Sequence, residues 1–123
     1  IQLGANDIVH LTPLNEATSD LQKLLSVTQA HSKKVIYFNS GSLGSAPLFP
    51  HPVDWFYAMR SKNFYNQFKE TAQKSNVIYV DLYYPREHDP FLKNPTLYYA
   101  EDSFHVSNTA YELWYQKILE KIE

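Results

Sequence analysis

The sequence predicts an α/β protein with a parallel sheet and helices on the faces of that sheet. Short apolar, β-branched runs alternate with longer segments whose apolar residues recur at intervals of three and four. This alternation is typical of parallel strands that are joined by crossover helices. The chain has 123 residues, of which 44% are hydrophobic and 20% are charged, and this size and composition fit one globular domain.

Three predicted elements occupy the first part of the chain. Ile1–Leu3 has the apolar character of a short buried strand, and it leads into the polar turn Gly4–Asp7. Thr12–Pro13 supplies the residue types of a helix cap and a first helical position, and the apolar spacing then predicts a helix to about His31. The apolar run Val35–Asn39 predicts a second, buried strand.

The second part repeats the pattern. A helix is predicted from about Asp54 to Lys74, and Asn76–Leu82 has the composition of a third strand. The last helix is expected to begin near Ser107 to Thr109, and either residue could serve as its N-cap. For the helix before the third strand, the predicted buried face consists of Trp55, Met59, Phe64, Phe68 and Ala72.

Composition excludes several classes of protein. The formal net charge of −2 gives no electrostatic basis for binding nucleic acid. No run of 18 apolar residues is present, so no transmembrane segment is expected in this chain. Because cysteine is absent, disulfides and thiolate metal sites are excluded, but the compartment is not indicated.

A carboxylate and an imidazole stand three residues apart just before the last predicted helix. In the turn Asp102–His105, the carboxylate can accept a hydrogen bond from one ring nitrogen and leave the other nitrogen free to take a proton. The same pattern also occurs where a histidine merely caps a helix. Its place after the last strand favours function, because ligands bind at the carboxyl ends of parallel strands.

The turn Gly4-Ala5-Asn6-Asp7 closes the first predicted strand. Glycine, asparagine and aspartate are common turn residues, so the turn has a purely structural interpretation. In the functional interpretation, the Asn6 amide donates to developing negative charge, and Gly4 allows a close approach of the backbone.

Taken together, Gly-x-Asn-Asp after one strand and Asp-x-x-His before the terminal helix resemble the SGNH hydrolases, also called the GDSL esterase/lipase family. The resemblance covers the whole chain in the order of its elements. It implies a three-layer α/β/α, flavodoxin-like fold in which a serine attacks an ester, with no metal or organic cofactor. It also implies that His105 is the general base, Asp102 orients it, Asn6 is an oxyanion donor, and Gly4 and Asp7 support the motif.

The family's Gly-Asp-Ser block, which carries the nucleophile, and its oxyanion glycine block precede Gly-x-Asn-Asp. Neither is found in these 123 residues. We therefore expect residues 1–123 to be the C-terminal part of a single SGNH hydrolase domain that lacks its leading β/α units, each of roughly 30 residues. The missing N-terminal segment, in the same chain or a separate one, is an expected partner, and the isolated chain is expected to be inactive.

Two alternatives concern other candidate sites. Ser42 lies in a sequence close to Gly-x-Ser-x-Gly, and Ser42, Asp102 and His105 follow the order of an α/β-hydrolase triad. The prolines that follow Ser42 disfavour the helix that such a nucleophile elbow requires. The run Arg86–Asp89, with His51, offers side chains that could bind a metal, but a solvated loop is the favoured interpretation.

The two long loops, 40–52 and 83–101, exceed the usual length of connections. The aromatic and apolar residues of these loops, with Trp55 just after the first loop, are predicted to wall an acyl pocket beside His105. The candidates are Leu48, Phe49, Trp55, Tyr83, Tyr84 and Phe91.

The resemblance implies that the parent protein is a serine ester hydrolase, which acts on a small-molecule acyl ester through an acyl-enzyme. A carbohydrate O-acetyl esterase or acyltransferase on the same scaffold would share every catalytic residue. In a non-catalytic, flavodoxin-like binding module, Asp102 and His105 would only cap the last helix.

Overall fold

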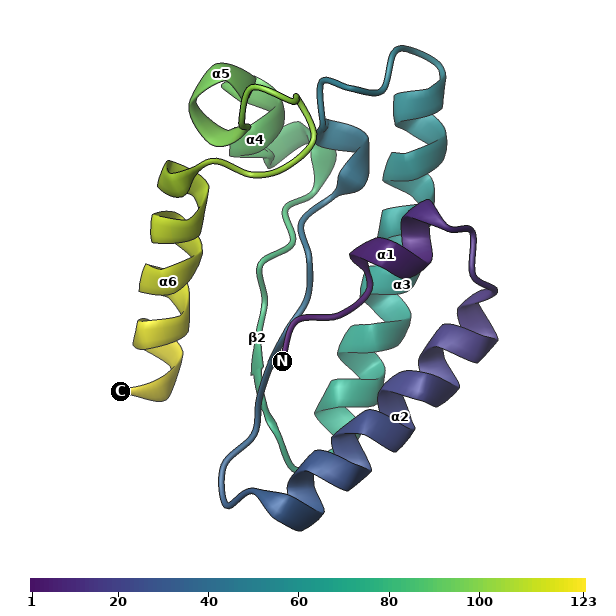
Figure 1. Ribbon diagram of the computed structural model, residues 1–123, viewed down its shortest axis with the longest axis vertical. Coiled ribbons are helices and arrows are strands. Elements are labelled where there is room, and N and C mark those ends of the chain that lie inside the picture. Colours follow the sequence, from purple (N-terminus) through teal and green to yellow (C-terminus); the bar gives the residue numbers. More distant parts are fainter.

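The computed structural model describes residues 1–123, in which helices cover both faces of a small parallel sheet (Figure 1). Strand β1 (Ile36–Phe38) pairs in parallel with strand β2 (Ile78–Val80). The predicted α/β class with a parallel sheet is therefore confirmed, although the sheet has only these two named strands. None of the helices is both long and apolar enough to cross a membrane.

The first predicted strand, Ile1–Leu3, is not a full strand in the structure and forms only a short parallel pairing with β1. The amino group of Ile1 donates to the carbonyl of Ile36 at 2.7 Å, and the amide of Phe38 donates to the carbonyl of Ile1 at 3.0 Å. Gln2 forms an isolated parallel bridge with Phe38. The carbonyl of Val35 bonds to β2 instead, so the N-terminal segment and β2 lie on opposite edges of β1.

The long predicted helices are present within two residues of their expected ends, and Ser107 is the N-cap of the last one because its Oγ accepts from the Ala110 amide at 3.3 Å. The Gly4–Asp7 turn and the two long loops contain short helices that their composition did not predict. The helices are α1 (Ala5–Val9), α2 (Leu14–His31), α3 (Val53–Lys74), α4 (Pro90–Lys93), α5 (Pro95–Tyr98) and α6 (Asn108–Ile122), with 3₁₀ helices η1 (Leu43–Ser45) and η2 (Arg86–His88).

Alternation along the strands divides the core in two. Side chains on a strand point to opposite faces in turn. Tyr37 and Tyr79 therefore join the hydrophobic cluster under α2 and α3, whereas Phe38 and Val80 join the cluster under α6. Figure 1 shows α6 on one side of the strands and α2 with α3 on the other.

The predicted buried face of α3 is wrong in its first two turns. Trp55 and Met59 are 62% and 61% exposed, whereas Phe64, Phe68 and Ala72 are buried as expected. On the same face of the helix, Ser61 lies three residues before the buried Phe64, and Tyr57 lies four residues before Ser61. Ser61 is buried, and its Oγ accepts a hydrogen bond from the Leu43 amide of η1 at 3.0 Å. The inner face of this part of α3 therefore packs against η1, which leaves the aromatic outer face uncovered.

Arg60 of α3 holds the end of α1 in place. Its guanidinium donates to the carbonyls of Ile8 at 3.0 Å, Asp7 at 3.1 Å and Thr12 at 2.5 Å. The last carbonyls of a helix have no partner within the helix, so a cation at this end satisfies them.

Replacement of Arg60 by Met keeps the aliphatic stem and removes all of these hydrogen bonds. We expect the free energy of unfolding to fall by about 2 kcal/mol or more, because hydrogen bonds to charged groups are worth roughly 1.5–3 kcal/mol. Urea denaturation followed by circular dichroism measures the change. Lys62→Met, at an exposed position of the same helix, is the control and should change stability by less than about 0.5 kcal/mol. Equal stability of the two variants would contradict the role of Arg60.

Candidate active site

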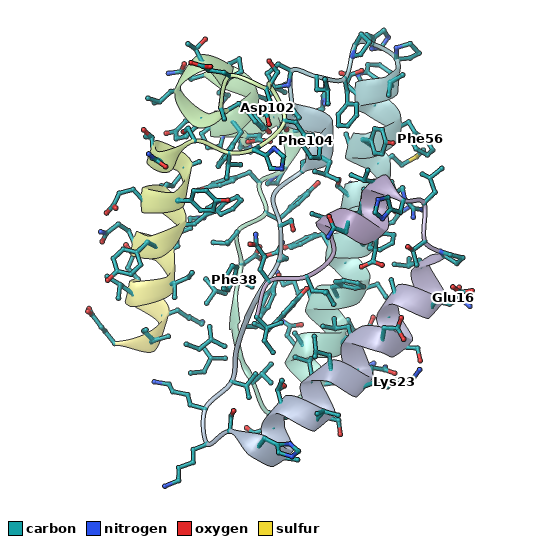
Figure 2. The ribbon with its side chains drawn as sticks, viewed as in Figure 1. Glu16, Lys23, Phe38, Phe56, Asp102 and Phe104 are labelled. Carbon is teal, nitrogen blue, oxygen red and sulfur yellow. The ribbon has the colours of Figure 1, made fainter.

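Asp102 and His105 form a hydrogen-bonded pair in the loop before α6, at the end of the molecule that Figure 2 labels with Asp102 and Phe104. Asp102 Oδ2 lies 2.5 Å from His105 Nδ1. The other oxygen, Oδ1, accepts from the backbone amides of Phe104 at 3.0 Å and His105 at 2.9 Å. An ionised carboxylate can only accept, so Nδ1 carries the proton and Nε2 is the nitrogen that can act as a base.

These hydrogen bonds, and not burial, set the charge state of Asp102. The side chain of Asp102 is 51% exposed and that of His105 is 73% exposed. The hydrogen bond from the His105 side chain, followed by the two backbone amides, lowers the pKa of Asp102 to about 2. The carboxylate is therefore ionised at every pH at which a histidine could accept a proton.

Backbone hydrogen bonds fix the turn that carries the pair. The Ala100 amide donates to the His105 carbonyl at 2.8 Å, and Tyr99 pairs with Val106 in an antiparallel bridge. Ser103, inside the turn, has a φ of 60°, and its carbonyl accepts from the Leu48 amide at 3.0 Å. The loop after β1 thus hydrogen-bonds to the turn and stabilises it, and the turn keeps the carboxylate and the imidazole close together.

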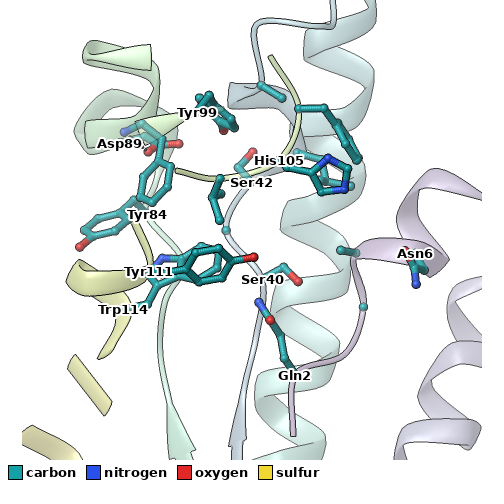
Figure 3. A pocket seen from close by; sticks show the side chains of 18 of the residues that line it. Gln2, Asn6, Ser40, Ser42, Tyr84, Asp89, Tyr99, His105, Tyr111 and Trp114 are labelled. Carbon is teal, nitrogen blue, oxygen red and sulfur yellow. Dashed lines mark hydrogen bonds between the residues drawn. The ribbon is translucent and has the colours of Figure 1, made fainter. Parts of the chain in front are cut away.

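A cavity of about 320 Å³ opens beside His105. Its lining comes from the N-terminal segment, the loop after β1, the loop after β2 and α6, which all meet at the carboxyl end of the sheet. In Figure 3, His105 lies on one side of this cavity, and Tyr84, Tyr111 and Trp114 lie on the other. The aromatic lining residues are Tyr84, Phe91, Tyr99, Phe104, Tyr111 and Trp114.

The Gly-x-Asn-Asp motif contributes to the same cavity. Gly4, Asn6 and Asp7 line it together with His105. Gly4 adopts a φ of 120°, which L side chains rarely adopt, so the backbone favours glycine here, and a Cβ at this position would also lie close to the Phe68 ring, at 3.2 Å. Asn6 is exposed on α1, and Figure 3 shows it at the margin of the cavity, apart from His105.

The predicted wall of the pocket differs from the cavity. Tyr84 and Phe91 line it, whereas Phe49, Trp55 and Tyr83 do not. The ring of Phe49 packs on Tyr57 at 4.4 Å, that of Trp55 lies 4.9 Å from His51, and that of Tyr83 stacks on Tyr65 at 4.2 Å. Leu48 is also outside the lining, at 51% exposure.

Sequence reasoning missed four of the aromatic lining residues as pocket residues: Tyr99, Phe104, Tyr111 and Trp114. Phe104 lies inside the Asp-x-x-His motif, and Tyr111 and Trp114 lie in the first turns of the helix that follows it. This proximity to the motif was the available signal, because residues next to a helix start share the edge of the sheet to which the motif belongs.

The two rejected candidate sites also have defined places. Ser42 lines the cavity and precedes η1, while the ring of His105 hydrogen-bonds to Asp102 alone. In the run Arg86–Asp89, Asp89 turns inward to accept from the Ser45 hydroxyl, and Arg86 pairs with Asp54 at 2.6 Å. Asp89 thus contacts η1 and Arg86 contacts α3, and the structure contains no group of three or more potential metal ligands.

A family model described as the GDSL-like Lipase/Acylhydrolase family matches residues 1–113. The chain belongs to this family. The resemblance seen in its two sequence motifs is therefore confirmed. No curated protein and no solved structure matches the chain. Membership of this GDSL-like family supports an esterase or acylhydrolase activity.

The Asp102–His105 pair predicts a measurable titration in this GDSL-like chain. In ¹³C NMR, the Asp102 carboxyl signal should titrate near pH 2. His105→Ala should move the pKa of Asp102 up toward the ordinary value of 3.8, because the largest stabilising hydrogen bond is lost. Since the folded-state pKa lies below the unfolded one, the ionised group stabilises the fold above about pH 4, and this contribution is lost as the pH falls toward 2. An unchanged Asp102 titration in His105→Ala would contradict the hydrogen-bonded pair.

Proposed function

We propose that this chain carries the general base and an oxyanion donor of a serine ester hydrolase that acts through an acyl-enzyme. The observation that carries the proposal is the Asp102–His105 pair at 2.5 Å beside an aromatic cavity. The acylhydrolase activity of the family supports the same reaction class. The substrate class is a small-molecule acyl ester, and the proposed reaction needs no metal or organic cofactor.

In the proposed reaction, His105 Nε2 removes the proton from a serine hydroxyl while the serine oxygen attacks the ester carbonyl. Asp102 holds the Nδ1–H and stabilises the positive charge that forms on the ring. The ring then gives its proton to the departing alkoxide, and water repeats the sequence to release the acid. Asn6 donates its amide to the oxyanion, after a side-chain rotation that its exposed position on α1 allows.

We assign the nucleophile to a serine in a segment that precedes Ile1 within the same three-layer, flavodoxin-like domain. Residues 1–123 contain no Gly-Asp-Ser, and no serine hydroxyl hydrogen-bonds to His105. The edge of the Ile1–Leu3 segment that faces away from β1 makes no strand pairing. Further parallel strands would complete the sheet on that edge, since exposed strand edges are normally paired or covered.

Replacement of His105 tests the base. In the protein that includes the nucleophile segment, His105→Ala should reduce kcat for a p-nitrophenyl acyl ester by roughly 10³-fold or more, because triad members act as a unit. Asp102→Asn should also lower kcat while the fold persists, because it favours the wrong imidazole tautomer. His31→Ala, at an exposed histidine on the last turn of α2, is the matched control and should leave kcat unchanged.

Two results would overturn this assignment. One is undiminished turnover by His105→Ala. The other is ester turnover by the 123-residue chain alone that Ser42→Ala abolishes, since this would make Ser42 the nucleophile.

Replacement of Asn6 tests the oxyanion donor. Asn6→Ala should reduce kcat by about 10²–10³-fold with little change in KM, because the donor acts mainly on the transition state. Stopped assays at saturating and limiting ester separate the two constants. Asn63→Ala, at an exposed asparagine of α3 outside this cavity, is the control. A change in KM alone would place Asn6 in ground-state binding and contradict its role as an oxyanion donor.

A further inference from the structure

The indole N–H of Trp114 lacks a hydrogen-bond acceptor. Trp114 lies on α6, lines the cavity beside His105 and is only 7% exposed, and its Nε1 is buried without a partner. A buried tryptophan N–H normally finds an acceptor, because leaving a desolvated donor unpaired destabilises the fold. The exception here therefore needs an explanation.

The edge of the indole that carries this N–H lies near Gly41, another residue of the cavity lining. A Cβ placed on Gly41 would lie 3.9 Å from Trp114 Cζ2. Cζ2 and Nε1 are both bonded to Cε2, so they share one edge of the ring system. Two aromatic rings pack on the indole: Phe91 stacks at 5.9 Å, and Tyr111 lies edge-to-face at 5.8 Å.

The other unpartnered groups do not share this position. The hydroxyls of Tyr37 and Tyr79 are also buried without partners, but both residues belong to the core cluster under α2 and α3. Neither lines the cavity beside His105. Trp114 is therefore the residue whose unused donor adjoins the cavity in which the proposed reaction takes place.

We propose that Trp114 determines substrate specificity by donating its indole N–H to a second oxygen of the substrate, separate from the ester group that reacts. The substrate class is an ester that carries a ketone, hydroxyl or ring oxygen in addition to the ester, in its acyl or its alcohol part. This inference rests on the proposed function for the identity of the ligand as an ester. Tyr111 is 54% exposed and packs edge-on to Trp114, so it can move aside when the substrate oxygen enters.

Selectivity follows from the unpaired donor. An alkyl group in the cavity leaves the N–H desolvated and unpaired, whereas an oxygen acceptor pairs it. One neutral hydrogen bond corresponds to a preference of roughly 3- to 10-fold for the oxygen-bearing ligand.

NMR of the ¹⁵N-labelled protein tests this without any turnover. The Trp114 indole cross-peak is the one that disappears in Trp114→Phe, and Trp55, exposed on α3 outside the cavity, is the internal control. The probes are N-methylpentanamide and N-methyl-4-oxopentanamide, whose shared amide replaces the ester, with methyl β-glucoside as the probe of the alcohol side. The oxo ligand should shift the Trp114 N–H downfield and bind roughly 3- to 10-fold more tightly than its alkyl partner.

Each outcome decides the proposal. A Trp114 shift with the glucoside alone also supports the donor and places the second oxygen in the alcohol part. Three results would overturn the proposal. The first is equal affinity for the oxo and alkyl ligands. The second is a shift of the Gly41 amide signal without a shift of the Trp114 N–H signal, and the third is binding by none of the probes. Trp114→Phe keeps an aromatic ring at this position. In this variant, the shift of the Gly41 amide signal can still report the affinities of the oxo and alkyl ligands. Tighter binding of the oxo ligand in the variant would also overturn the proposal.

Kinetics in the protein that includes the nucleophile segment separate this inference from the proposed function. Trp114→Phe should lower the ratio of kcat/KM for a 4-oxopentanoate ester over a pentanoate ester by roughly 3- to 10-fold, and Trp55→Phe should not change that ratio. His105→Ala should lower kcat by roughly 10³-fold or more and leave the NMR preference intact. Undiminished hydrolysis in His105→Ala therefore defeats the proposed function alone, whereas an unchanged ratio in Trp114→Phe defeats the specificity role alone.

Discussion

The parallel pairing of Ile1–Leu3, β1 and β2 is the constraint on which the rest of the structure depends. Parallel strands bring their carboxyl ends to one edge of the sheet, so the segments that follow all three begin side by side. This places Asn6 from the start of the chain and His105 from its last fifth around one cavity. Few backbone hydrogen bonds make the pairing, but two hydrophobic clusters, one on each face, hold it in register.

Two carboxylates near this cavity show how environment separates chemical roles. Asp102 is half exposed, and hydrogen bonds from His105 and the backbone lower its pKa. Asp89 is 2% exposed, and burial raises its pKa although it accepts from Ser45 and the Phe91 amide. The exposed carboxylate stays ionised beside an imidazole, which suits an orienting partner of a base. The buried one links the loop after β1 to α4 and so supports the wall of the cavity.

Local patterns predicted much of this protein correctly. Apolar spacing located α2, α3 and α6, and the β-branched runs located β1 and β2, because these signals depend on residues close together in the chain. The contact between Asp102 and His105 was also predictable, since a turn of three residues brings the two side chains within reach. The family followed from two short motifs. The short helices in the long loops were not predicted, since proline and aromatic content there indicated only irregular structure.

The sequence by itself therefore determined the fold class, the family and the hydrogen-bonded pair, all of which rest on local spacing. Tertiary structure alone decided which aromatic side chains enclose the cavity. Trp55 and Tyr83 are aromatic residues of the kind expected in a pocket wall. However, η1 packs against the inner face of α3, so Trp55 is exposed on the outer face, and Tyr83 stacks on Tyr65. From its spacing in the sequence, Trp114 is predicted to be an ordinary core residue of α6. Only the packing around it in the structure shows that its buried N–H has no acceptor. Whether a donor is satisfied depends on residues distant in sequence, and no local pattern encodes that.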